Sequence, residues 1–428
     1  MPHETPPPAA GSSATSLPAP DSAGVRMPAT ASGTAGLAPA ALQALGLSPT
    51  ALQRAERVLQ DDISSARLPG AVVLLSRRGQ IAWHEAFGKR DPASPDPMRR
   101  DAIFRIYSMT KPIVSLAVMR LVEEGRLSLS DPISRWLPAF AAPRVLEAAN
   151  GAAETVLRPA SRPITVQDLL RHTAGLSYEF IAQGPLQQAY LDADLGSRKR
   201  DNAAFCDVLA KLPLTCDPGA RWEYSRATDV LGRLVEIVAD EPLGVHLARR
   251  FFQPLGMVDT GFFVPPAQHH RIAEPFPVDP DTGDEVRLLD PCRAPAFESG
   301  GGGLMSTSGD YARFLQMLVD KGRTAAGERL VARKTLELMT ADHLGTIPAA
   351  SDLLPPGHGF GLGFAVRTHA GLATVPGSVG QYFWSGIAGT TFWVDPKEEI
   401  FAILMTQAPG RRDHYRQLFR SLVYAALD

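Results

Sequence analysis

The stretch that decides the fold is Arg105-Ile106-Tyr107-Ser108-Met109-Thr110-Lys111-Pro112, which places a Ser-x-x-Lys pair at the start of a predicted helix. Apolar residues recur near helical spacing after it, up to the expected helix end at Gly125. Because positions i and i+3 share one face of a helix, Lys111 is expected beside the Ser108 hydroxyl. Burial lowers the pKa of a lysine, so that a neutral amine can accept the proton of a serine nucleophile. A helix cap followed by a solvated lysine is the alternative interpretation of the pair.

The composition is that of a globular protein with a sizeable core, at 428 residues and 45% hydrophobic content. A formal net charge of −2 gives no electrostatic reason to expect a nucleic acid or an anionic membrane as partner. The cysteines are too few and too scattered for a disulfide framework, the histidines show no metal-ligand spacing, and no apolar stretch is long enough to span a bilayer. We therefore expect no nucleic-acid partner, no membrane partner and no metal.

Residues 1–46 are rich in Pro, Ala, Ser, Gly and Thr and carry few large apolar side chains. Such a segment cannot bury enough surface to offset its ordering entropy. It also lacks the basic start and apolar core of a secretory signal. We expect a disordered tail over residues 1–46 on a cytoplasmic protein.

Strand signals stand near both ends of the remaining chain, with helical patterns between them. The early elements are a helix over residues 50–67, a hairpin of strands 71–76 and 81–84, and the helix that follows Ser108. Helices are then expected over residues 166–171, 203–212, 229–239, 243–252, 308–321 and 332–340. The late strands are expected over residues 361–367, 381–384, 390–394 and 400–406, before a final helix over 412–426. Strands at both ends imply one sheet assembled from both ends of the chain.

This pattern divides the chain into two predicted domains. Residues 47–134 and 300–428 form an α/β domain that carries the Ser108 helix and the sheet. Residues 135–299 form a mainly helical domain with few strands. Loops over residues 178–200 and 341–359 are expected to build the pocket.

Two further stretches add candidate groups to the Ser-x-x-Lys pair. Tyr224 stands in Trp222-Glu223-Tyr224-Ser225-Arg226, ahead of a predicted helix, from where it can reach a cleft or remain a core aromatic. A phenol beside a cationic lysine has its anionic form favoured, so Tyr224 is a candidate second base. Small residues interrupt the strand region 381–390, where they allow either close approach of a ligand or a β-bulge.

Taken in order, Ser108-Met109-Thr110-Lys111, Tyr224-Ser225-Arg226 and Trp384-Ser385-Gly386 resemble the motifs of the class C β-lactamase and penicillin-binding-protein superfamily, in particular its family VIII carboxylesterase branch. The resemblance extends from residue 50 to the C-terminus, with supporting stretches at 169–176, 253–257 and 301–307. It implies the β-lactamase/transpeptidase-like fold, an α+β architecture. In this fold, helices flank an antiparallel sheet from both chain ends, and a mainly helical domain is inserted.

The resemblance also implies a role for each matching residue. Ser108 is expected to be the acyl-accepting nucleophile, with Lys111 and Tyr224 as the base pair that activates it. The backbone N–H groups of Ser108 and Ile387 are expected to form the oxyanion hole, each worth about 2.7–4 kcal/mol in the transition state. Deacylation is expected to use the same pair on a water molecule, with no cofactor.

Substrate contacts are expected from Trp384, Ser385, Gly386 and Arg226. The β-lactamase pattern has asparagine where this chain has Arg226, and Lys-Thr-Gly where it has Trp384-Ser385-Gly386. That lysine helps β-lactamases to hold the substrate carboxylate, so the tryptophan replaces a cation by an apolar wall. The departure favours a serine carboxylesterase acting on short-chain, uncharged, small-molecule esters.

Several alternatives share this nucleophile, namely β-lactamase, D-specific peptidase and acyltransferase, and a non-catalytic penicillin-binding-like sensor is the alternative of another class. The oligomeric state is left open. His172 lies in a stretch that resembles a structural turn of the superfamily, and the lack of a Gly-x-Ser-x-Gly elbow argues against an α/β-hydrolase triad. The run Gly300–Gly303 lacks a following Lys-Ser/Thr, so we expect it to permit tight backbone packing beside the site and not to bind phosphate.

Overall fold

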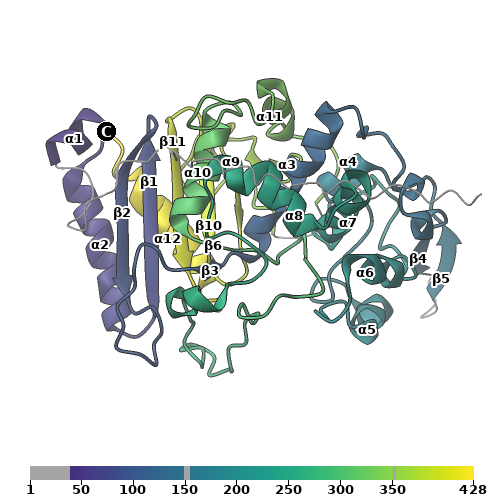
Figure 1. Ribbon diagram of the computed structural model, residues 1–428, viewed down its shortest axis with the longest axis horizontal. Coiled ribbons are helices and arrows are strands. Elements are labelled where there is room, and N and C mark those ends of the chain that lie inside the picture. The colour runs from purple at the N-terminus through teal and green to yellow at the C-terminus, as the bar shows by residue number, and fades with distance from the viewer. Residues whose placement is uncertain (1–38, 149–154, 350–352) are drawn as a thin grey trace, which may run out of the picture. The chain divides into compact units, whose positions relative to one another are not determined.

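The computed structural model describes residues 39–148, 155–349 and 353–428 (Figure 1). Most of the predicted tail, residues 1–38, lies outside this range. The prediction of disorder is wrong for residues 39–46, because helix α1 (Pro39–Ala44) forms there. Leu42 and Leu45 are buried, and the buried Leu47 forms a β-bridge with Leu427. These leucines supply the apolar surface that the average composition of the tail conceals.

A seven-stranded antiparallel sheet brings early and late segments of the chain side by side (Figure 1). Its strand order is β2-β1-β11-β10-β9-β8-β7, and β1 pairs with β11 with Leu74 opposite Ile403. This order confirms the predicted sheet from both chain ends and the β-lactamase/transpeptidase-like fold. Its strands are β1 (Gly70–Arg77), β2 (Gln80–Gly88), β7 (His358–Phe360), β8 (Ala365–Arg367), β9 (Tyr382–Ser385), β10 (Thr391–Asp395) and β11 (Ile400–Thr406).

Helices precede, separate and follow these strands, mostly where the sequence predicts them. They are α2 (Pro49–Ser64), α3 (Thr110–Glu123), α4 (Val166–Leu170), α5 (Gly184–Asp192), α6 (Asn202–Leu209), α7 (Ala227–Ala239), α8 (Leu243–Leu247), α9 (Gln253–Leu255), α10 (Ser308–Val319), α11 (Arg333–Met339) and α12 (Arg412–Tyr424). Shorter turns are η1 (Tyr107–Met109), η2 (Ile133–Arg135), η3 (Pro138–Phe140), the π turn η4 (Ala248–Phe252) and η5 (Pro266–Arg271). Within the described residues, no helix has both the length and the apolar character needed to cross a membrane.

Helices cover both faces of the sheet. Trp83 of β2 donates a hydrogen bond to Glu56 of α2 and packs against Phe419 of α12. The next residue, His84, hydrogen-bonds with Ser308 of α10 on the opposite face, because successive side chains of a strand alternate in direction. All residues of β1 and β11 are buried, as expected for central strands that are covered on both faces.

The segment between the two halves of the sheet is mainly helical, with two elements that the sequence did not predict. β4 (Arg144–Ala148) and β5 (Thr155–Pro159) form a hairpin, and the expected pocket loop over residues 178–200 contains α5. A second pair of short strands, β3 (Phe104–Arg105) and β6 (Met305–Ser306), leads into the Ser108 turn. The residues that the structure describes group into one compact unit, so the division into two domains stays a prediction.

α3 is buried along most of its length. Eleven of its 14 residues are buried, and it packs against α7. Gly363, next to β8, approaches Ser115 of the same helix so closely that a Cβ would lie 2.5 Å from its Oγ atom. Contacts with both the sheet region and the helical segment explain why the α3 sequence is apolar all round instead of along one stripe.

Candidate active site

Ser108 lies in the turn η1, between β3 and α3, and is half-buried. The Ile106 N–H donates to the Leu304 carbonyl, which fixes the chain that enters the turn. Tyr107 has a φ of 43°, a left-handed conformation that is rare and strained for a large side chain. Its hydroxyl accepts a hydrogen bond of 2.9 Å from the Leu289 N–H, which holds it there. The strained turn presents Ser108 at the start of α3.

Lys111 lies beside Ser108, as the i, i+3 spacing predicts. Its Nζ atom is 3.2 Å from Ser108 Oγ, 3.0 Å from Tyr178 OH and 2.5 Å from the Gly301 carbonyl oxygen. The side chain is buried, and burial lowers the pKa of Lys111 to about 7. A large share of the amine is therefore neutral near neutral pH and able to take the proton of the serine.

Tyr224 lies in the segment that enters α7 and also contacts the serine. Its hydroxyl accepts a bond of 3.2 Å from Trp384 Nε1, and it is close enough to Ser108 for the serine to influence its pKa. Lys111 Nζ lies 4.6 Å from the Tyr224 ring centre, over the ring face. Burial raises the pKa of Tyr224, so the expectation that the lysine favours its anionic form is wrong. At neutral pH Tyr224 is a protonated phenol.

Tyr178 is a member of the site that the sequence did not identify. Its hydroxyl accepts a hydrogen bond from Lys111, and its ring centre lies 5.3 Å from that of Tyr224 and 4.8 Å from that of Phe180. The Arg226 guanidinium covers the ring at 4.8 Å. The only signal was its place at the start of an expected pocket loop.

The turn between β9 and β10 brings Trp384, Ser385 and Gly386 to the segment that precedes the serine. A Cβ on Gly386 would lie 2.5 Å from the Ile106 carbonyl oxygen and 2.3 Å from Thr390 Oγ1. Glycine is therefore required for the turn to approach the Ile106 segment this closely, whereas the ligand approach expected from the sequence stays a prediction.

Two backbone amides at this junction have no protein acceptor. Among the residues that the structure describes, neither the Ser108 N–H nor the Ile387 N–H donates to a protein group. Ile387 directly follows Gly386, and its side chain is 41% exposed. Free N–H groups beside a serine hydroxyl can stabilise a developing oxyanion, which fits the predicted oxyanion hole.

Two of the predicted substrate contacts are engaged within the protein. The Ser385 hydroxyl lies 2.8 Å from Thr391 Oγ1. Arg226 Nη2 donates a bond of 2.6 Å to Glu179, and Nη1 lies 3.7 Å from the Asp229 carboxylate. These pairings hold the Arg226 guanidinium against Glu179 and Asp229, and the substrate contact expected for it stays a prediction.

His172 supports the Tyr224 segment. Its Nδ1 atom accepts a bond of 3.2 Å from the Ser225 N–H, and its carbonyl accepts one of 2.9 Å from the Glu223 N–H. Burial, and secondarily the charge of Lys111, lowers the pKa of His172 well below its usual value, so the ring is neutral. These contacts agree with the structural role that the turn suggests.

The run Gly300–Gly303 packs tightly beside the site, as the sequence predicts. A Cβ on Gly300 would lie 2.5 Å from the Thr228 carbonyl oxygen, and one on Gly301 would lie 2.7 Å from the Asp229 carboxylate.

In the part of the chain that the structure describes, no group of three or more His, Cys, Asp or Glu side chains is placed to hold a metal ion.

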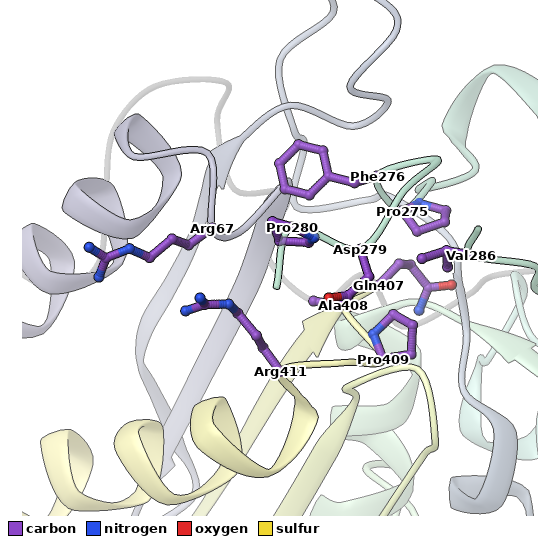
Figure 2. A pocket seen from close by; sticks show the side chains of 10 residues that line it. All are labelled: Arg67, Pro275, Phe276, Asp279, Pro280, Val286, Gln407, Ala408, Pro409 and Arg411. Atoms are coloured by element: carbon purple, nitrogen blue, oxygen red, sulfur yellow. The ribbon is translucent and has the colours of Figure 1, made fainter. Parts of the chain in front are cut away.

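Figure 2 shows a small cavity beside the segment that follows β11. Its lining includes Gln407, Ala408, Arg411 and side chains from Pro275 to Val286. The Ala408 N–H donates a bond of 2.7 Å to the Ala388 carbonyl within the turn. At about 10 Å³ the cavity has room for one water molecule and is too small to receive an ester.

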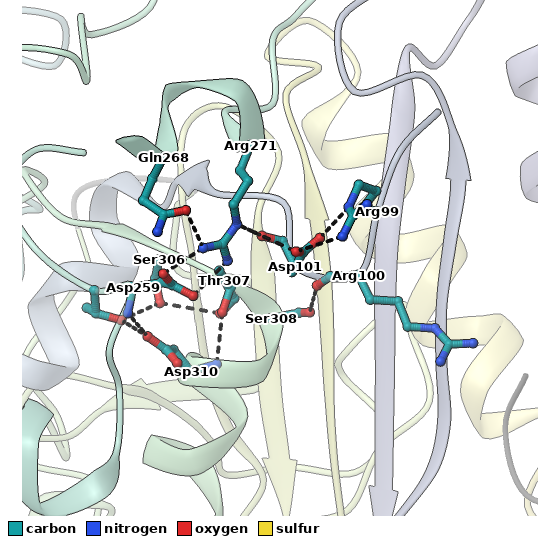
Figure 3. A network of polar contacts seen from close by, with 11 residues as sticks. Arg99, Arg100, Asp101, Asp259, Gln268, Arg271, Ser306, Thr307, Ser308 and Asp310 are labelled. Carbon is teal, nitrogen blue, oxygen red and sulfur yellow. Dashed lines mark hydrogen bonds and ion pairs between the residues drawn. The ribbon is translucent and has the colours of Figure 1, made fainter. Parts of the chain in front are cut away.

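A polar network steadies the strand pair β3–β6 (Figure 3). Arg271 donates two bonds of 2.8 and 2.7 Å to the Asp259 carboxylate and one of 2.9 Å to the Asp101 carbonyl. Asp310 of α10 accepts bonds from the Asp259 N–H at 2.7 Å and from the Thr260 hydroxyl at 2.9 Å. Burial raises the pKa of Asp310 to about 6.

The antiparallel sheet and the contact between Ser108 and the buried Lys111 are those of a β-lactamase-type serine hydrolase. The β-lactamase family model matches residues 52–425, and the chain therefore belongs to the β-lactamase family.

Known relatives of the chain include esterases. It is 32% identical over 394 residues to esterase EstB of Burkholderia gladioli, covering 87% of this chain and 95% of that protein. It is 37% identical over 349 residues to protein Rv1367c of Mycobacterium tuberculosis, covering 79% and 86%. The solved structure of EstCE1, described as a hydrolase with promiscuous acyltransferase activity, has a TM-score of 0.74 and 30% identity, covering 88% of this chain and 98% of that one.

Proposed function

We propose that the protein is a serine carboxylesterase of the family VIII type that hydrolyses short-chain, uncharged, small-molecule esters through an acyl-enzyme. The observation that carries the proposal is the 3.2 Å contact between Ser108 Oγ and the buried amine of Lys111. The description of the relative EstB as an esterase supports the same reaction class.

In acylation, the neutral Lys111 amine takes the Ser108 proton while Oγ bonds to the ester carbonyl carbon. The N–H groups of Ser108 and Ile387 stabilise the charge that develops on the carbonyl oxygen. Collapse of the tetrahedral intermediate then breaks the bond to the alcohol oxygen, and the Lys111 ammonium returns its proton to that leaving group. The Tyr224 hydroxyl, which lies beside Ser108, relays this proton and stays neutral overall.

In deacylation, a water molecule takes the place of the departed alcohol. Lys111 accepts its proton as the water oxygen bonds to the acyl carbon, and the same amides hold the second oxyanion. Collapse releases the carboxylic acid, and the proton held by Lys111 returns to Ser108 Oγ.

The surroundings of the serine favour uncharged substrates. Trp384 is neutral where the β-lactamase pattern has a lysine, and the positive charge of Arg226 is paired with Glu179. Phe180, which stacks on Tyr178, is 55% exposed, and Ile387, near the Ser108 turn, is 41% exposed. Both offer apolar surface to a substrate. A substrate carboxylate finds no free partner among these groups, which disfavours β-lactamase and D-peptidase activity.

The test is a panel of p-nitrophenyl esters, an anilide and a cephalosporin, with intact-mass measurement of the protein during turnover. We expect fastest turnover of short-chain esters, and an added acyl mass that disappears in Ser108→Ala together with the activity. Full ester turnover by Ser108→Ala would contradict the proposal. A burst without steady turnover would instead support the penicillin-binding-like sensor.

Acyl transfer is a second candidate, and the similarity to EstCE1, a hydrolase with promiscuous acyltransferase activity, favours it. The two functions differ only in whether water or an alcohol attacks the acyl-enzyme. Adding a small alcohol to the ester assay separates them, because a transferase forms a new ester in proportion to the alcohol added.

A further inference from the structure

Asp229 is a buried carboxylate to which the reaction above assigns no part. It lies in the first turn of α7 and is 1% exposed. Its Oδ1 atom accepts a bond of 2.5 Å from the Ser299 hydroxyl and one of 2.9 Å from the Gly301 N–H. Its Oδ2 atom accepts no hydrogen bond from any described residue, and Arg226 Nη1 lies 3.7 Å away. A buried carboxylate oxygen that has a distant ion-pair partner but no hydrogen-bond donor is costly, which calls for an explanation.

The Gly301 peptide connects this carboxylate to the proposed base. Its N–H donates to Asp229, and its carbonyl accepts the 2.5 Å bond from Lys111 Nζ. A Cβ on Gly301 would lie 2.7 Å from Asp229 Oδ2, so glycine permits this close approach. Because the carboxylate fixes the orientation of the peptide, it also fixes the carbonyl that holds the amine.

The charge of Asp229 acts on Lys111 as well. Burial lowers the pKa of Lys111, Asp229 opposes this shift, and Arg226 adds to it. The titratable or charged groups that face the amine are His172, Tyr178, Tyr224, Arg226 and Asp229. His172 and both tyrosines are neutral at neutral pH, so Asp229 is the one anion among these five groups.

We propose that Asp229 is the positioning residue of Lys111. It holds the Gly301 carbonyl that keeps the amine at Ser108, and it supplies the negative charge that lets a buried amine bind the serine proton. The inference rests on the proposed function only in treating Lys111 as the base. A base without this support is both displaced and less basic, which slows proton transfer from the serine.

The test is the Asp229→Asn variant, since asparagine keeps an acceptor for Ser299 and Gly301 and removes only the charge. We expect the acid limb of its kcat/KM profile to move to lower pH by about half a unit or more, with a plateau kcat about 10-fold or more below wild type. Glu236→Gln is the matched control, because Glu236 is a partly buried carboxylate on the same helix that bonds to Asn202 and Arg233. Its acid limb should coincide with that of the wild type.

A direct titration makes the result independent of esterase activity. The Lys111 Cε signal in protein labelled with ¹³C-lysine is assigned by its loss in Lys111→Met and followed against pH. A lower midpoint in Asp229→Asn supports the inference even if the protein proves not to be an esterase. An unchanged or higher midpoint overturns it, whatever the activity.

A second variant covers the case in which Asp229→Asn does not fold. Ser299→Ala removes one donor to Asp229 and leaves the carboxylate less neutralised. We expect the Lys111 midpoint and the acid limb to move to higher pH, opposite to Asp229→Asn. No shift, or a shift to lower pH, in folded Ser299→Ala overturns the inference.

Discussion

Trp384 Nε1 donates a hydrogen bond of 3.2 Å to the Tyr224 hydroxyl, and both side chains are buried. The residue that stands in place of the lysine of the β-lactamase pattern thus also orients the phenol at Ser108. Because Trp384 occupies an acceptor site of the hydroxyl, the phenol proton is free to point toward the serine. The roles that we propose in substrate choice and in proton transfer therefore meet at this one position.

Trp384→Phe separates the two roles, because it keeps an apolar ring and removes the donor. We expect kcat on a short-chain ester to fall about 3- to 10-fold, the cost of one hydrogen bond, with little change in KM. Trp384→Lys restores the cation and should improve kcat/KM for a carboxylate-bearing ester relative to its neutral analogue. If the ratio of kcat/KM for these two substrates is the same in Trp384→Lys and in the wild type, the interpretation of Trp384 as an apolar wall is wrong.

The pH dependence of ester hydrolysis should report Lys111. Burial lowers the pKa of Lys111 to about 7, so below that pH the amine holds a proton and cannot accept the one on Ser108. We expect kcat/KM to rise with pH and to reach half its maximum near pH 7.

Lys111→Ala should lower kcat by roughly 10³-fold or more, while His172→Ala should mainly lower Tm. The reverse pattern in the two variants would identify a histidine base.

The two buried tyrosines offer a matched comparison. Tyr224→Phe removes a hydroxyl that contacts Ser108, and we expect kcat to fall about 10²- to 10⁴-fold, as for loss of a proton-transfer group. Tyr178→Phe removes only an acceptor of Lys111, so its kcat should fall less than about 10-fold. Steady-state kinetics at saturating ester measures both values. Equal losses in the two variants would mean that Tyr224 has no special part in proton transfer.

The parts of the fold that the sequence predicts are those set by local periodicity. The run Ile400–Thr406 was predicted with the bounds that β11 has, and the i, i+3 spacing placed Lys111 at Ser108. The sequence does not predict the hairpin β4–β5. The apolar residues Val156 and Leu157 of β5 are adjacent and both exposed, so the strand lacks the alternation of apolar and polar residues that marks a half-buried strand.

The rest of the site depends on contacts between distant segments. Tyr178 reaches Lys111 over 67 positions, and Gly301 reaches it over 190, so no sequence pattern announces either contact. The sequence predicts a lowered pKa for Tyr224, whereas the structure raises it. The direction depends on the burial of the phenol and on Lys111 facing the ring, and neither can be read from the sequence. Motif order supplies the residues that we propose to react, whereas their ionisation follows only from the packing.

The polar network under β3–β6 predicts how stability varies with pH. Burial raises the pKa of Asp310 from 3.8 to about 6, so the folded state binds this proton more tightly than the unfolded state. The stability that it contributes is present below about pH 4 and is lost as the pH rises through 6.

Asp310→Asn keeps an acceptor for the Asp259 N–H and the Thr260 hydroxyl without the buried charge. We expect its Tm to exceed that of the wild type by a few degrees at pH 8 and to match it at pH 4, measured by calorimetry across that range. Asp320→Asn, at the exposed C-terminal end of the same helix, is the control, and its Tm should vary with pH as that of the wild type does. A Tm of Asp310→Asn that is lower than wild type by the same amount at every pH would instead mean that the carboxylate is needed in its charged form.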